Sequence, residues 1–155
     1  MSQEFDPNAA ASADAGLYGL GTPLAEAGVV VLGVPFDATA SYRKGAARGP
    51  RAILRASLQV DLFDLAHWRP YEAGLAMAPI DERFDAWNAE AGALADQVIA
   101  ACGRVAGDAS LQRALARVNA LGAEVNRAVL SSTREVLARG ALPVLVGGDH
   151  STPFG

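Results

Sequence analysis

The sequence is poor in cysteine and histidine, because its 155 residues include one cysteine, Cys102, and two histidines. A single thiol excludes a disulfide within the chain and fits a reducing compartment, so we expect Cys102 to be a small packed side chain. The first residues show neither the basic segment nor the apolar segment of a secretory signal. We therefore expect a cytoplasmic protein.

Long runs of one residue class are also missing. No cluster of lysine and arginine occurs and the net charge is −4, which argues against a nucleic-acid partner. No apolar run is long enough to cross a bilayer, so we expect no membrane partner. The chain has 51% hydrophobic and 19% charged residues, a composition typical of one globular domain with its own core.

Two short apolar runs, at 29–33 and 142–146, are rich in valine and predict buried, parallel strands that lie side by side. The segments between them predict a helix, a half-exposed strand and two more helices, at 51–57, 60–64, 81–102 and 110–139. Residues 66–79 predict irregular structure. Strands that alternate with helices indicate an α/β fold with a mainly parallel sheet.

The helical segments carry apolar residues at the spacing of a 3.6-residue period. Pro50 fits the first position of the first helix, and Gly140 fits the end of the last one. The side chains expected to face inward are Ile53, Leu54, Trp87, Leu94, Val98, Ile99, Leu111, Leu115, Val118, Gly122, Val125, Val129 and Val136. We divide the chain into a tail and loop at 1–28 and a domain at 29–155.

Polar residues follow both strands, and the carboxyl ends of parallel strands are where α/β proteins bind ligands. The loop 37–49 and the turn that contains His150 should therefore line one crevice. A neutral imidazole there could ligate a metal, or it could hydrogen-bond the turn backbone. The Gly-Gly turn lacks the lysine of a phosphate-binding loop, so a phosphate site is disfavoured. His67 is expected to be a surface or packing residue.

Three motifs together resemble the ureohydrolases, which are the arginase, agmatinase and formimidoylglutamase enzymes. They are Gly-Val-Pro-Phe-Asp ending at Asp37, Tyr-Arg-Lys-Gly-Ala-Ala-Arg-Gly-Pro-Arg-Ala-Ile at 42–53, and Gly-Gly-Asp-His-Ser at 147–151. The tyrosine-arginine loop and the arginine-glycine-proline helix start resemble the agmatinase branch most.

The resemblance implies a three-layer αβα fold and two manganese ions, with nickel or another divalent ion as an alternative. The ions activate a bridging hydroxide that attacks a guanidinium carbon and releases urea. His150 corresponds to the first metal ligand, and Asp149 should orient the turn. In the 37–49 loop, Tyr42 and Arg43 are the expected substrate contacts, although the loop could instead pack against a neighbouring subunit.

The chain departs from the family pattern in one large respect. The later Asp-x-His-x-Asp and Asp-x-Asp motifs, which supply the other ligands, do not occur, and no catalytic acid or base is assigned. We therefore expect the amino-terminal portion of a ureohydrolase, inactive alone and homo-oligomeric when complete. Agmatine, guanidinobutyrate and arginine remain open as substrates. The alternatives are a non-catalytic ureohydrolase-like subunit that supports a complete partner, and an α/β nucleotide-binding module.

Overall fold

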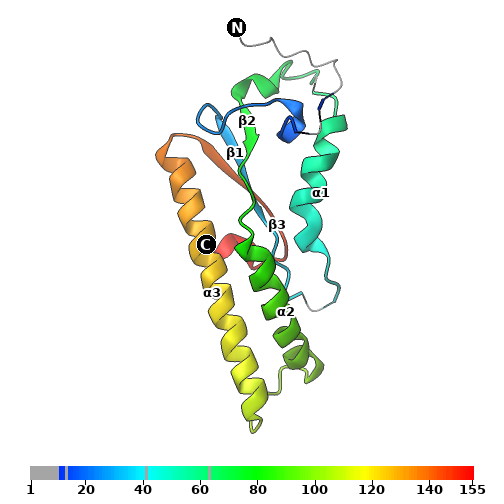
Figure 1. Ribbon diagram of the computed structural model, residues 1–155, viewed down its shortest axis with the longest axis vertical. Helices are drawn as coiled ribbons and strands as arrows, with labels where there is room; N and C mark the ends of the chain where they lie inside the picture. The colour runs from blue at the N-terminus through cyan, green and yellow to red at the C-terminus, as the bar shows by residue number, and fades with distance from the viewer. Residues whose placement is uncertain (1–10, 13, 41, 63) are drawn as a thin grey trace.

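Three parallel strands form the sheet of the computed structural model, which describes residues 11–12, 14–40, 42–62 and 64–155 (Figure 1). The strands are β1 (Val29–Val34), β2 (Leu75–Met77) and β3 (Leu142–Gly147), in the order β2-β1-β3. Val29 pairs with the first residue of each neighbour, so the carboxyl ends of β1 and β3 lie at the same edge. The predicted α/β fold and the pairing of the two valine-rich strands are confirmed.

Successive side chains of β1 point to opposite faces of the sheet, and each face is covered by helix. Val30 and Leu32 are buried in one cluster with Val136 of α3 (Ala109–Ala138). Gly33 faces the other way, where a Cβ would lie 3.0 Å from Pro50 of α1 (Gly49–Ala56). The sheet therefore lies between α1 and α3, which makes the three layers visible in Figure 1.

Helix α2 (Arg83–Ala100) packs along α3, and both ends of α3 are set by local signals. At its start, the Asp108 carboxylate accepts hydrogen bonds from the backbone N–H groups of Ser110 and Leu111, which have no partner within the helix. At its end, Gly140 has a left-handed φ of 78°, and the N–H groups of 140 and 141 donate to carbonyls of the last turn. The predicted glycine cap is confirmed.

The buried face of α3 is made of residues spaced by fours, one three and one seven. The buried residues are Ala114, Val118, Leu121, Val125, Val129 and Val136. The four valines were predicted, and Leu111, Leu115 and Gly122 lie at the margin of this face, half-buried. The face completes a core cluster with Phe36 of the β1 end and Phe84 of α2.

The predicted strand at 60–64 is wrong for the residues described there, and Phe63 lies outside them. Val60 is exposed, and Asp64 and Trp68 form a single antiparallel bridge that closes a tight turn. The Asp64 carboxylate accepts the N–H groups of Ala66 and His67, so this turn satisfies its own polar groups without a sheet. His67 is exposed, as predicted.

The second strand comes instead from the segment predicted to be irregular. Leu75–Met77 contains no β-branched residue, but it lies against the free edge of β1 and pairs with Val29–Val31 there. Tertiary pairing, rather than local preference, therefore makes β2 a strand.

Several burial predictions are wrong. Ile53 and Ile99 are 45% and 37% exposed, and Pro50 supplies the buried contact of α1. Cys102 is exposed rather than packed, because it lies in the turn after α2 with a φ of 52°. Helix α2 buries small residues, among them Gly92, whose Cβ position lies 3.3 Å from the Lys44 ammonium nitrogen.

Strand β3 is less buried than predicted. Among the described residues it pairs only with β1, and the strand carries Leu142 and Val144, which are 59% and 37% exposed.

Within the same described part of the chain, no helix has both the length and the hydropathy that a membrane span needs. Of the tail and loop assigned to 1–28, residues 1–10 and 13 lie outside the described residues.

Candidate functional site

The loop after β1 and the turn after β3 meet at the carboxyl edge of the sheet, because Val34 pairs with Gly147. The Asp149 N–H donates to the Phe36 carbonyl at 2.9 Å, which joins the two segments directly. A Cβ on Gly148 would lie 1.8 Å from the same carbonyl oxygen, so only glycine allows this approach. The predicted proximity of the 37–49 loop and the His150 turn is thus confirmed.

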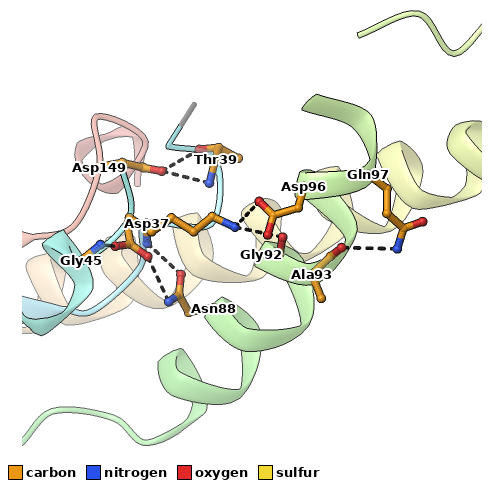
Figure 2. Close-up of polar contacts among 10 residues, drawn as sticks. Asp37, Thr39, Gly45, Asn88, Gly92, Ala93, Asp96, Gln97 and Asp149 are labelled. Carbon is orange, nitrogen blue, oxygen red and sulfur yellow. Dashed lines mark hydrogen bonds and ion pairs between the residues drawn. The ribbon is translucent and has the colours of Figure 1, made fainter. Parts of the chain in front are cut away.

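Asp149 connects the turn to the loop through its contacts with Thr39, which Figure 2 shows, and its other carboxylate oxygen accepts hydrogen bonds within the turn. Its Oδ1 accepts from the Ser151 N–H at 2.9 Å and the Ser151 hydroxyl at 2.5 Å. Its Oδ2 accepts from the Thr39 N–H at 3.2 Å and the Thr39 hydroxyl at 2.7 Å. Burial acts to raise the pKa of the Asp149 carboxyl, but these hydrogen bonds together hold the pKa below its ordinary value.

Asp37 organises the other side of the loop from a buried position, with 3% of its surface exposed. Its Oδ2 accepts from the N–H of Gly45 at 2.6 Å and of Ala47 at 3.1 Å, and its Oδ1 accepts from the Asn88 amide at 3.2 Å. Burial acts to raise the pKa of Asp37, but these donors and the nearby Lys44 charge lower the pKa below its ordinary value. Asp37 is therefore a buried anion that loop and helix stabilise together.

Lys44 makes a further connection between the loop and α2. Its ammonium group donates to the Gly92 carbonyl at 3.0 Å and to the Asp96 carboxylate at 2.5 Å. Lys44 therefore ties the 37–49 loop to α2. Figure 2 shows the two other connections, from Asp37 to Asn88 of α2 and from Thr39 to Asp149 of the His150 turn.

The three predicted site residues lie at this edge, but no hydrogen bond or ion pair joins them within the described part of the chain. Tyr42 is 98% exposed, and Arg43 and His150 are also exposed. Among the same described residues, none hydrogen-bonds to the His150 imidazole or forms an ion pair with it. The turn backbone is held by Asp149 instead, which leaves the imidazole nitrogens available to a ligand.

The described residues do not fit a complete metal centre. Nowhere in 11–12, 14–40, 42–62 and 64–155 do three or more histidine, cysteine, aspartate or glutamate residues gather as a metal site requires. Asp149 is adjacent to His150, but both of its oxygens are occupied by the donors of Thr39 and Ser151. His150 is therefore a single candidate ligand, and two metals would need donors from elsewhere.

Two hollows lie near these elements, and neither includes His150 in its lining. A groove of about 470 Å³ separates the loop from α2 and is lined by Asp37, Lys44, Arg48, Asn88 and Asp96, among others. Another hollow, of about 650 Å³, lies between α1, β2 and residues 14–24. Neither of these two hollows is therefore the crevice predicted around His150.

Sequence reasoning missed Thr39 and Asn88, which provide the links between elements. Asn88 lies inside a helix, where asparagine is an unfavourable residue and usually needs a local reason. That reason is its hydrogen-bonded exchange with Asp37, 51 positions away, which no local pattern could indicate.

An α/β sheet with an exposed histidine and anchored loops at its carboxyl edge places the chain among the α/β proteins, which bind their ligands at this edge. The comparison with protein families narrows that class, because residues 27–155 match the Arginase family. The chain belongs to this family, and the resemblance seen in the three motifs is confirmed.

Its curated relatives are ureohydrolases. It is 32% identical over 126 residues to an N(1)-aminopropylagmatine ureohydrolase of Thermococcus kodakarensis, covering 81% of this chain and 33% of that protein. It is 29% identical over 129 residues to an agmatinase of Pyrococcus horikoshii, covering 83% and 34%. A shorter match is to an N(1)-aminopropylagmatine ureohydrolase of Synechocystis. The two proteins are 51% identical over 43 residues, which make up 28% of this chain and 14% of that protein.

The chain thus spans about a third of the length of the two relatives that it matches most extensively. No solved structure matches it significantly.

Proposed function

We propose that this chain is the amino-terminal part of an agmatinase-like ureohydrolase that cleaves a guanidino compound to urea and an amine. The observation that carries the proposal is the family match over 27–155, which includes the Gly-Gly-Asp-His-Ser turn at the carboxyl end of β3. The names of the relatives favour substrates of the agmatine class, which combine a guanidinium group with an aliphatic amine chain.

The roles proposed for the described residues follow from their positions. His150 contributes one ligand to a pair of manganese ions whose other ligands the described residues do not supply. Such ions, when bound, lower the pKa of water and stabilise negative charge on the reacting centre. Asp149 holds the turn that presents His150, and Tyr42 and Arg43 contact the substrate. We further propose a cytoplasmic homo-oligomer for the complete enzyme.

The test begins with the DNA downstream of the codon for Gly155. We expect an open reading frame that encodes the Asp-x-His-x-Asp and Asp-x-Asp motifs, and the longer protein should release urea from agmatine or aminopropylagmatine with Mn²⁺. The 155-residue chain alone should release none and should not bind two Mn²⁺ ions in a titration. Urea release by the short chain above that of its own His150→Ala variant would contradict the proposal.

The two histidines of the chain provide a matched pair of variants in the longer protein. His150→Ala should remove most of the activity and lower the manganese bound per chain, because it deletes a ligand. His67→Ala should leave both unchanged, because His67 is exposed in a turn and pairs with Asp64 of that same turn. Equal effects of the two substitutions would contradict the role of His150.

The downstream DNA sequence also distinguishes the proposed enzyme from the alternative of a non-catalytic subunit. A stop codon after Gly155, together with a complete homologue encoded nearby whose activity rises when this chain is added, would favour the subunit. Thermal stabilisation by nucleotides, without any effect of Mn²⁺, would favour the nucleotide-binding module instead.

A further inference from the structure

Residues 38–40 and 42–44 are the described part of the segment that follows Asp37, and one side chain joins the two residues that flank this segment. Asp37 precedes the segment, and its Oδ2 accepts the N–H of Gly45, which follows the segment, at 2.6 Å. A second bond from Ala47, at 3.1 Å, fixes the chain beyond it. Gly45 has a φ of 138°, a backbone geometry that glycine adopts readily and that directs its N–H to this acceptor.

Asp37 and Asn88 exchange hydrogen bonds in both directions. The Asp37 N–H donates to Asn88 Oδ1 at 2.7 Å, while Asn88 Nδ2 donates to Asp37 Oδ1 at 3.2 Å. The amide of Asn88 can therefore face only one way, because a flip would break both bonds. This exchange attaches the base of the loop to α2, a long helix packed on the core.

Other described contacts hold single points of the loop, since Thr39 donates to the Asp149 carboxylate and Lys44 donates to the Gly92 carbonyl and to Asp96. Tyr42 is 98% exposed, and Lys44 reaches Asp96 through a pair in which the Asp96 side chain is 63% exposed. Exposed ion pairs contribute little to stability. Asp37 differs from these contacts in that it is buried and, among the described residues, is the only carboxylate that joins the two residues flanking this part of the loop.

We propose that Asp37 and Asn88 are a positioning pair that sets where the loop carries Tyr42 and Arg43 relative to the guanidino substrate. The proposal rests on the function proposed above, and neither Asp37 nor Asn88 touches substrate in it. Their loss acts through the loop, so it weakens substrate binding more than it affects the metal-dependent step.

The hydrogen-bond pattern allows a specific rescue. In an Asp37→Asn variant, the new Nδ2 faces Asn88 Nδ2, so two donors oppose each other. In the double variant Asp37→Asn, Asn88→Asp, the amide at position 37 donates to the carboxylate at position 88, while the amide oxygen still accepts from Gly45 and Ala47. The carboxylate at position 88 can also accept the backbone N–H of position 37. Every hydrogen bond is thereby restored, and the negative charge is moved from position 37 to position 88.

The experiment compares these variants in the longer, active protein. Tyr42→Ala should raise KM more than about tenfold, and Asp37→Asn should do the same with little change in kcat or in bound manganese. The double variant should recover most of the loss. Asp96→Asn, which alters the exposed carboxylate of the Lys44 pair, is the matched control and should change KM less than about threefold.

Trypsin provides a readout that needs no activity, since Arg43 and Lys44 are cleavage sites within the loop. Asp37→Asn should speed cleavage there, detected by mass spectrometry, and the double variant should slow it again. If the longer protein hydrolyses no guanidino compound, the proposed function fails while trypsin still tests the pair. Unchanged KM and cleavage in Asp37→Asn, or a double variant as impaired as the single one, would overturn the proposal.

Discussion

A single glycine, Gly148, decides whether the ends of β1 and β3 can approach each other. An alanine there would place its Cβ 1.8 Å from the Phe36 carbonyl oxygen, which is backbone and cannot move aside. We expect Gly148→Ala to lower the free energy of unfolding by about 3 kcal/mol or more, at the upper end of overpacking costs.

The matched control is Gly122→Ala. Gly122 lies inside α3, and apart from its chain neighbours and the nearby backbone of its own helix no described atom lies within 4 Å of its Cβ position, so alanine should stabilise the helix by about 0.5–1 kcal/mol. Urea unfolding of the longer protein carrying each substitution measures both effects. Similar changes in the two variants would contradict the role assigned to Gly148.

The lowered pKa values of Asp37 and Asp149 predict that the protein becomes less stable at acidic pH. A carboxyl whose folded pKa lies below its unfolded value, near 3.8, stabilises the fold fully above that value. The stability is lost as the pH falls from that value through the folded pKa, because the unfolded state takes up a proton that the folded carboxylate does not yet bind. We expect the urea midpoint to fall progressively from about pH 5 downward.

The measurement uses the longer protein with a chelator, so that metal release does not contribute. Asp37→Asn should weaken the pH dependence of the urea midpoint below about pH 5. Asp96→Asn leaves the buried Asp37 carboxylate intact, so this variant should keep the pH dependence of the wild type. A wild-type midpoint that is constant down to about pH 3 would be inconsistent with stabilised carboxylates in the folded state.

For single residues, the role was predictable from the sequence where it depends on near neighbours in the chain. Asp149 was expected to orient the turn, and it does so through Ser151, two positions away. Asn88 was missed because its partner is distant in the sequence. Ile53 was misplaced because a helical period identifies an apolar face without showing whether anything covers it.

Among the elements, β3 is the one whose surroundings differ most from expectation. Its apolar composition predicts burial, yet one of its edges has no strand beside it in the described residues, and Leu142 is 59% exposed. Unpaired N–H and C=O groups on an apolar edge favour association with another chain. We expect the 155-residue chain to associate as its concentration rises.

Sedimentation velocity of two lysine variants tests this explanation. Leu142→Lys places a charge on the edge strand and should shift the chain toward monomer. Leu137→Lys removes an apolar side chain of similar exposure, 55%, from α3, and should have a smaller effect. A monomer at all concentrations, or equal effects of both variants, would show that the edge does not drive association.

Helices and the two valine-rich strands were predictable because each carries its own period or its own caps. Strand β2 was not, since only the register with β1 makes Leu75–Met77 extended. The turn at 64–68 was mistaken for part of a strand because its hydrogen bonds, from backbone neighbours to the Asp64 carboxylate, follow no period.

For the whole molecule, the order of elements and the three motifs were sufficient to predict both the α/β architecture and the family. The geometry of the candidate site was predictable only in outline. Parallel strands place 37–49 and His150 at one edge, but the side chains that join them come from three separate segments.

The pairing of β1 with β3 also sets a schedule for the growing chain. Thr39 and Asp149, which join the two strand ends, are 110 positions apart, and ribosomes add about 5–20 residues each second. For roughly 5–20 s after Thr39 is made, the valines of β1 can pack at most against β2 and the helices, which are themselves made during this interval. During synthesis, the edge of β1 that will later pair with β3 therefore stays unpaired, so chaperones or other nascent chains have time to bind it.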